Sequence, residues 1–187
     1  MGLMKMNRDV VVDIDGVLAD FEGEFVRIFG DDRRELESLE SRYPNPNKAR
    51  SINQFVNNPR TYQKLEPISL GIAIVDYLND NGYDVNIITS RPLDTEWVTR
   101  RWLKKWGVEF LSFGIYPNKI HRIAEIAPVC AIDDLISVSR HLEPYNVPVL
   151  MIQHPWNWFY EYKQRIFSNI NQFMTAFNKI ITDQEKK

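Results

Sequence analysis

The sequence has little cysteine, little net charge and no long apolar run, and each shortage excludes a class of protein. Its one cysteine, Cys130, cannot form a disulfide within the chain, and apolar neighbours indicate a small buried side chain. This fits a reducing compartment, so we expect a cytoplasmic location. A net charge of −2 gives no overall attraction to nucleic acid or to an anionic membrane. No apolar run could cross a bilayer, and residues 1–6 lack the apolar core of a secretory signal.

The order of the remaining segments predicts an α/β protein. Its 187 residues fit one domain with a small insertion. Short apolar runs between turn residues predict strands, and their alternation with helical patterns favours a parallel sheet with helices on both faces. Ser69 is the expected N-cap of one helix. The expected strands are residues 10–12, 85–89, 110–116, 129–132 and 147–152, and the expected helices are residues 21–29, 69–81, 94–106, 118–126 and 135–142.

Residues 22–66 interrupt this alternation and predict a small helical insertion. Residues 31–42 are highly charged with a helical pattern, and residues 43–47 break the pattern with two prolines. The apolar pattern of the sheet returns only at the end of this segment. We therefore expect a core of residues 1–21 and 67–187, with residues 22–66 set apart from it.

Residues 156–182 are predicted to carry a long helix that covers the sheet. The loop before this helix, residues 154–158, follows the last predicted strand and could border a site. We favour a simpler role for it, in which Trp156 and Trp158 anchor the helix. The apolar side chains of the helix form one stripe, which consists of Ile166, Ile170, Phe173, Met174, Phe177 and Ile181.

Polar residues stand where several of the predicted strands end. Asp13 and Asp15 follow the first strand, and Gly16 permits a tight turn there. Burying a carboxylate without a partner has an unfavourable free energy, so this pair would destabilise a buried strand. In parallel sheets the carboxyl ends of strands meet at one edge, where ligands bind. One such residue alone would be an ordinary cap or turn residue, but four such positions together indicate a site. The others are Thr89 with Ser90, Lys119, and Asp133 with Asp134.

This combination of carboxylates, hydroxyls and an ammonium group indicates phosphoryl transfer. Clustered carboxylates repel one another and shift their pKa values unless a cation neutralises them, and hard oxygen ligands favour Mg²⁺. One carboxylate can attack phosphorus as a nucleophile. A second, two residues further on, can protonate the leaving oxygen and later activate water. Hydroxyl and ammonium groups can hold the remaining phosphate oxygens.

The sequence resembles the haloacid dehalogenase superfamily in four motifs that occur in the family's order. They are Asp13-Ile14-Asp15-Gly16-Val17 for motif I, Thr89 or Ser90 for motif II, Lys119 for motif III and Asp133-Asp134 for motif IV. The stretch of residues 13–22, DIDGVLADFE, is most similar to the opening motif of the 5'(3')-deoxyribonucleotidases. This resemblance implies a Rossmann-like core with a helical cap inserted after motif I. It also implies an enzyme that removes phosphate from nucleoside monophosphates with Mg²⁺.

The resemblance gives the four aspartates separate roles. Asp13 would be the nucleophile that forms an aspartyl-phosphate, and Asp15 would be the general acid and base. A dehalogenase has no leaving oxygen to protonate, so Asp15 favours phosphate over halide chemistry. The implied metal ligands are Asp13, the main-chain carbonyl of Asp15, Asp134 and, directly or through water, Asp133.

The resemblance also implies which residues contact the substrate. Thr89, Ser90 and Lys119 would hold the phosphate. Phe21 matches an aromatic position of the family's substrate pocket, where it could stack on a base, although a place in the core beneath the cap is equally compatible. Arg91 follows Ser90 at a point where the deoxyribonucleotidases have proline directly. Its side chain could contact phosphate or substrate, or pair with another residue on the surface.

Three kinds of function stay open. They are a nucleotidase, a phosphatase of sugar phosphates or of nucleic-acid 3'-phosphate ends, and a non-catalytic binding module that the intact motifs disfavour. Residues 97–106 interleave tryptophan with arginine and lysine, as in surfaces that bind single-stranded nucleic acid. A helix that buries Val98, Trp102, Leu103 and Trp106 is the simpler explanation. We therefore expect a small phosphate monoester as partner, no membrane, no nucleic acid, and a monomer or homodimer.

Overall fold

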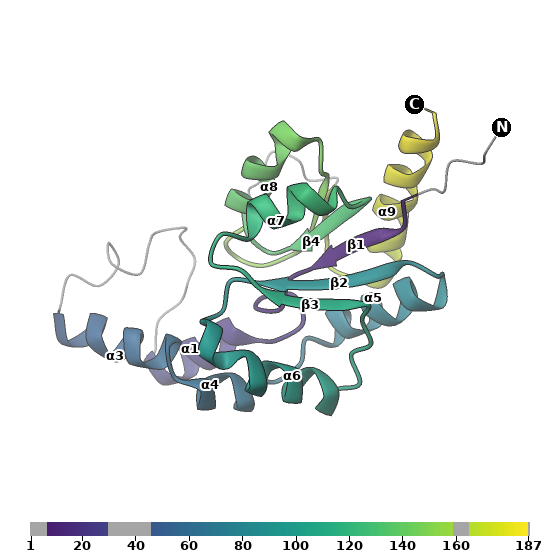
Figure 1. Ribbon diagram of the computed structural model, residues 1–187. Helices are drawn as coiled ribbons and strands as arrows, with labels where there is room; N and C mark the ends of the chain where they lie inside the picture. The colour runs from purple at the N-terminus through teal and green to yellow at the C-terminus, as the bar shows by residue number, and fades with distance from the viewer. Residues whose placement is uncertain (1–6, 30–45, 159–164, 187) are drawn as a thin grey trace.

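The computed structural model describes residues 7–29, 46–158 and 165–186, and its centre is a parallel sheet (Figure 1). The strand order is β3-β2-β1-β4-β5-β6, and every neighbouring pair is parallel. This confirms the predicted α/β class. The strands are β1 (Asp9–Val12), β2 (Asp84–Thr89), β3 (Ser112–Ile115), β4 (Cys130–Asp133), β5 (Val149–Ile152) and β6 (Ile166–Phe167).

Helices cover both faces of the sheet because successive strand residues point to opposite sides. Val10 and Val12 of β1 pack into one apolar cluster, and Val11 packs into another on the opposite face. The first cluster includes side chains of α5 (Ser69–Asp80), α6 (Glu96–Lys105) and α9 (Ile170–Glu185). The second includes side chains of α7 (Lys119–Ile126) and α8 (Ile136–Leu142). In Figure 1, α7 and α8 lie on one side of the central strands, and α5 and α6 lie on the other.

The helices predicted for residues 21–29, 69–81, 94–106, 118–126 and 135–142 agree with the structure apart from details at their ends. Residue Ser69 is the first residue of α5 and not its N-cap, since Ile68 holds that position without a side-chain hydrogen bond. A single 3₁₀ turn, Leu93–Thr95, precedes α6. This helix buries Val98, Trp102 and Leu103 as predicted. Among the described residues, no helix is both long enough and apolar enough to span a membrane.

The end of the chain holds a strand that the sequence did not predict. The predicted helical stripe begins at Ile166, but Ile166 and Phe167 form β6, which pairs with Met151 and Ile152 of β5. Ile166 lies four residues before Ile170, so the two residues match the spacing of a helix although Ile166 belongs to a strand. Helix α9 begins only at Ile170, where the Asn169 side chain accepts a hydrogen bond from the backbone N–H of Gln172.

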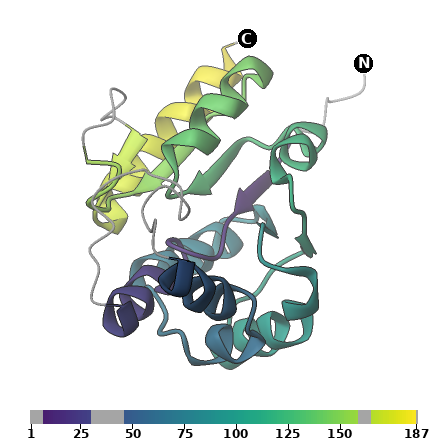
Figure 2. The same cartoon turned by 90° about the vertical axis from the view of Figure 1, so that its left-hand side faces the viewer.

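A helical insertion follows the first strand, as predicted. It contains α1 (Phe21–Phe29), α3 (Pro46–Val56) and α4 (Pro59–Lys64). Helices α1 and α3 lie side by side near the end of the sheet toward which the strand arrows point (Figures 1 and 2). Phe25, Ile52 and Phe55 form a small apolar cluster between them. The helix predicted for residues 31–42 lies outside the described residues.

The two ends of this insertion run side by side. Ala19 and Pro67 form an antiparallel bridge. The backbone N–H of Asp20 donates to the carbonyl of Glu66 at 2.9 Å, and that of Ile68 donates to the carbonyl of Leu18 at 2.7 Å. The chain therefore leaves the core and returns to it at one place.

Candidate active site

The site lies where the order of the strands reverses. From β1 the chain continues to β2 on one side, whereas from β4 it continues to β5 on the other side. In open α/β sheets such a switch point leaves a crevice at the carboxyl ends of the two central strands. Asp13 follows β1 and Asp133 ends β4, and the backbone N–H of Asp13 donates to the carbonyl of Ile132 at 3.0 Å.

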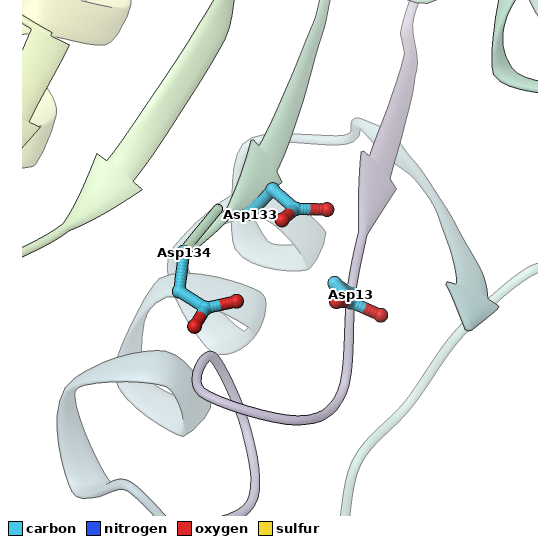
Figure 3. Close-up of side chains that lie close together, drawn as sticks. All are labelled: Asp13, Asp133 and Asp134. Carbon is cyan, nitrogen blue, oxygen red and sulfur yellow. The ribbon is translucent and has the colours of Figure 1, made fainter. Parts of the chain in front are cut away.

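Three carboxylates meet in this crevice. Asp13, Asp133 and Asp134 are buried, and each offers an oxygen within 4.8 Å of the others (Figure 3). Burial is the main cause that raises the pKa of Asp13 to about 7, against the attraction of Lys119. Burial and the charges of Asp133 and Asp13 raise the pKa of Asp134 well above its usual range. Ionising all three carboxyl groups in this space is therefore unfavourable unless a cation stabilises their charge.

Lys119 provides one positive charge beside this cluster. It is the first residue of α7, and its buried Nζ donates to Asp13 Oδ2 at 2.6 Å and to Asp133 Oδ2 at 2.7 Å. Burial alone would lower the pKa of Lys119, but the attraction of the two carboxylates raises it above the usual value. Lys119 therefore stays charged and holds the ends of β1 and β4 together.

The donor atoms fit a divalent cation that prefers oxygen ligands. Asp13 Oδ1 is buried, and it has no hydrogen-bond partner within the described part of the chain. Both oxygens of Asp133 are engaged, one by Lys119 and the other by the backbone N–H of Leu135 at 3.0 Å. Asp134 accepts a hydrogen bond at Oδ2. Three carboxylates beside one ammonium group leave an excess of negative charge, which is the setting of Mg²⁺ sites in proteins.

Gly16 forms the turn that the sequence predicted and lies directly against Asp134. Its φ is +76°, and a Cβ atom there would lie 2.4 Å from Asp134 Cγ. Such a contact is far inside the van der Waals distance, so only glycine fits both the backbone conformation and the space.

A Gly16→Ala variant is expected to lower the free energy of unfolding by about 3 kcal/mol. Left-handed backbone strain contributes roughly 1–2 kcal/mol of this and the displaced Asp134 the rest. Gly107→Ala is the matched control, because Gly107 has φ +69° but no atom within 4 Å of its Cβ position. Urea titration of both variants separates the two contributions. Equal losses in the two variants would mean that the contact with Asp134 costs nothing.

The loop after β5 holds Asp134 from the other side. Trp156 Nε1 donates to Asp134 Oδ2 at 3.0 Å, and Asn157 Nδ2 donates to the Asp134 carbonyl at 3.1 Å. His154 stacks on Trp156 at 4.3 Å, and its Nε2 lies 2.7 Å from the Gly16 carbonyl. Burial lowers the pKa of His154, so the ring is neutral and Nε2 carries the hydrogen that this carbonyl accepts.

These contacts add a role for Trp156 that was not predicted from the sequence, because its indole N–H donates to a carboxylate of the site. The two residues in this hydrogen bond are 22 positions apart in the chain, so no local sequence pattern predicts it. The position of this loop after a predicted strand is the one sequence signal that pointed to it.

Asp15 does not join the three carboxylates but pairs with Arg91. Arg91 Nε donates to Asp15 Oδ2 at 2.8 Å, and Nη2 donates to Oδ1 at 2.7 Å. Arg91 is only 3 % exposed, so pairing on the surface is the wrong alternative for it. Thr99 Oγ1 accepts from Nη1 at 3.1 Å, and the Tyr62 ring lies 4.5 Å from the guanidinium carbon.

A cavity of about 250 Å³ opens above these groups and reaches the helical insertion. The Phe21 ring stacks on Tyr62 with 5.8 Å between centroids and also packs against Phe55, so it lines the cavity and belongs to the core at once. All predicted site residues line this cavity except Asp133, which reaches it through Lys119. The lining residues are Asp13, Asp15, Phe21, Glu22, Val56, Tyr62, Thr89, Ser90, Arg91, Pro92, Lys119, Asp134 and Leu135.

Solved structures share this fold at low sequence identity. A candidate phosphatase from Clostridium difficile has a TM-score of 0.63 at 14% identity, with 92% of this chain and 99% of that one covered. A hydrolase from Pseudomonas syringae has a TM-score of 0.60 at 11% identity, covering 92% and 98%. A haloacid dehalogenase-like hydrolase from Streptococcus pneumoniae has a TM-score of 0.57 at 13% identity, covering 91% and 90%. These likenesses show the haloacid dehalogenase fold.

The sequence itself matches one family. No curated protein matches the chain. The family model described as "5' nucleotidase, deoxy (Pyrimidine), cytosolic type C protein" matches residues 7–168, a range that contains every residue of the cavity. The chain therefore belongs to this 5'-nucleotidase family, and it is a phosphoric monoester hydrolase with a haloacid dehalogenase fold.

Proposed function

We propose that the protein is a Mg²⁺-dependent nucleotidase that releases phosphate from nucleoside monophosphates through an aspartyl-phosphate. The observation that carries this proposal is the composition of the cavity. Asp13, Asp15 and Lys119 line it together with the aromatic side chains of Phe21 and Tyr62. The charged groups can hold a phosphate while the aromatic side chains contact a nucleoside.

In the proposed first step, an oxygen of Asp13 forms a bond to phosphorus and the ester P–O bond breaks. The leaving oxygen takes a proton from the Asp15 carboxyl group, so the nucleoside departs as an alcohol. In the second step the Asp15 carboxylate removes a proton from water. The water oxygen bonds to phosphorus, and the bond between phosphorus and the Asp13 oxygen breaks. Inorganic phosphate leaves, and the Asp13 carboxylate is regenerated. The protons balance, since Asp15 gives one and regains one.

The remaining polar groups of the cavity would hold the phosphate. Lys119 provides a fixed positive charge, because its Nζ is buried between Asp13 and Asp133. Ser90 is exposed to the cavity and Thr89 is buried at the end of β2, so the Ser90 hydroxyl is the more accessible donor. Such donors stabilise the charge that develops on the phosphate oxygens in the transition state.

Asp13, Asp134 and the main-chain carbonyl of Asp15 would hold Mg²⁺, with Asp133 acting through water. The unpartnered Asp13 Oδ1 and the two engaged oxygens of Asp133 support this division. When bound, the ion would supply positive charge that lowers the repulsion between a carboxylate nucleophile and a phosphate dianion.

Residues 22–66 would act as a cap over the core of residues 1–21 and 67–187. This cap supplies Glu22, Val56 and Tyr62 to the cavity, and Phe21 at its base would stack on the nucleobase. The family description supports a pyrimidine deoxynucleotide as substrate and a cytoplasmic location. We further propose that the protein works as a monomer or homodimer.

A panel of phosphate esters tests the proposed function. With Mg²⁺ present, a pyrimidine deoxynucleoside monophosphate is expected to have a kcat/KM about tenfold or more above that of a sugar phosphate or a 3'-phosphorylated oligonucleotide. EDTA should abolish phosphate release, and added Mg²⁺ should restore it. Preference for the sugar phosphate or the oligonucleotide would replace the nucleotide assignment. Hydrolysis of none of these esters would favour a binding module.

A further inference from the structure

We propose that Arg91 is a positioning residue that fixes the Asp15 carboxyl group for proton transfer and does not itself bind the substrate. This inference rests on the proposed function, because it takes Asp15 to be the acid and base of the reaction. It replaces the interpretation of Arg91 as a ligand of phosphate or nucleoside.

The contact between the two side chains has the geometry of a fixed pair. Two nitrogens of the guanidinium each donate to a different oxygen of Asp15, at 2.8 and 2.7 Å. A fork that binds both oxygens sets the plane of the carboxyl group as well as its position, which a single hydrogen bond to lysine would not do. Within the described residues, no other side chain donates a hydrogen bond to this carboxyl group.

Arg91 is itself held by two other helices. Its third nitrogen, Nη1, donates to Thr99 on α6, and the Tyr62 ring of α4 lies against the guanidinium face. The side chain is about 1 % exposed, whereas that of Asp15 is 27 % exposed. Each guanidinium nitrogen therefore already has a partner in the protein, and Asp15 is the member of the pair that the substrate can reach.

The pair also accounts for the absence of Asp15 from the cluster of Asp13, Asp133 and Asp134. The negative charge of Asp15 contributes to the raised pKa of Asp13, so the two groups repel each other. Without Arg91, the Asp15 side chain could turn toward Asp13 and Asp134, which would hold the cation. The guanidinium holds the Asp15 carboxyl group in the lining of the cavity and outside the cluster of Asp13, Asp133 and Asp134.

The test compares two substrates whose leaving groups differ in their need for a proton. The two substrates are a nucleoside monophosphate and dinitrophenyl phosphate. The nucleoside oxygen must be protonated as it leaves, whereas dinitrophenolate leaves as a stable anion. In single-turnover experiments with Mg²⁺, Arg91→Ala is expected to slow nucleoside release about hundredfold and dinitrophenolate release less than about threefold. The KM for the nucleotide should change little, because Arg91 does not bind it.

Thr99 provides a milder version of the same change. Thr99→Val removes the acceptor of Nη1 at nearly constant volume, and it should slow nucleoside release alone by about three- to tenfold. Thr99→Ser keeps the hydroxyl and should restore the rate. Arg100→Gln is the matched control, since Arg100 pairs with Glu96 on the exposed face of α6, and both rates should stay at the wild-type values.

A double variant ties the effect to Asp15. Once Asp15→Asn has removed the acid, adding Arg91→Ala should slow nucleoside release no further, because the two residues act as one unit. Equal losses on both substrates, a change confined to KM, or additive losses in the double variant would each overturn the role of Arg91. If the wild-type protein cleaves neither substrate, the proposed function itself fails, and this outcome is distinct from the others.

Discussion

Replacing Asp13 with asparagine is expected to lower kcat by about four orders of magnitude or more while the protein stays folded. An amide oxygen is a poor nucleophile toward phosphorus, so no aspartyl-phosphate would form. The substitution preserves shape, and its oxygen can still accept the hydrogen bond that Lys119 donates to Asp13 at 2.6 Å. Phosphate release from a nucleotide with Mg²⁺ measures the loss, and thermal unfolding shows that the fold persists.

Asp9 offers a matched control at the other end of the same strand. It accepts a hydrogen bond from Asn86 at 2.8 Å and does not line the cavity, so Asp9→Asn should leave the rate unchanged. Mass spectrometry of the wild-type enzyme, quenched in acid during turnover, should locate one added phosphoryl group on the peptide that contains Asp13. If Asp13→Asn keeps more than about one per cent of the activity, another residue is the nucleophile.

Replacing Lys119 with methionine is expected to lower the free energy of unfolding by about 3–5 kcal/mol without metal, and to abolish activity. The variant leaves Asp13 and Asp133 buried with no positive charge between them. Urea titration in EDTA, followed by tryptophan fluorescence, measures the loss. Lys104→Met on the exposed face of α6 is the control and should stay within about 0.5 kcal/mol of the wild type.

Two further measurements show whether charge is the cause of this loss. Adding Asp13→Asn to Lys119→Met removes one of the two stranded carboxylates, so the double variant should be more stable than Lys119→Met alone. Saturating Mg²⁺ should also stabilise Lys119→Met by binding only the folded form. If neither change recovers stability, the loss comes from packing and not from unpaired carboxylates.

The sheet and the centre of the site could be predicted because they depend on local patterns. The valine run of β1, followed at once by Asp13, fixes both a buried strand and the position of a carboxylate at its end. Parallel strands then bring Asp133 and Asp134 to the same edge without any knowledge of side-chain contacts. Lys119 could be predicted in the same way, since it begins the helix that follows β3 of the same sheet.

The features that were missed depend on contacts between distant residues. Arg91 and Asp15 are 76 residues apart, and no local sequence pattern around either residue predicts that they pair. Trp156 reaches Asp134 only because the loop after β5 folds back over the site. The two-residue strand β6 is too short to show an alternating pattern. Its residues were therefore included in the apolar pattern of the helix that follows.

The bridge between Ala19 and Pro67 has a consequence for how such a protein can diversify. Because both ends of the insertion are tied to each other, its length and sequence can change without moving Asp13 or the strands behind it. Mutation could therefore change the residues that this insertion contributes to the pocket while Asp13 keeps its position. For the engineer, residues 19 and 67 form a graft junction where the insertion of a relative could be transplanted onto this catalytic core.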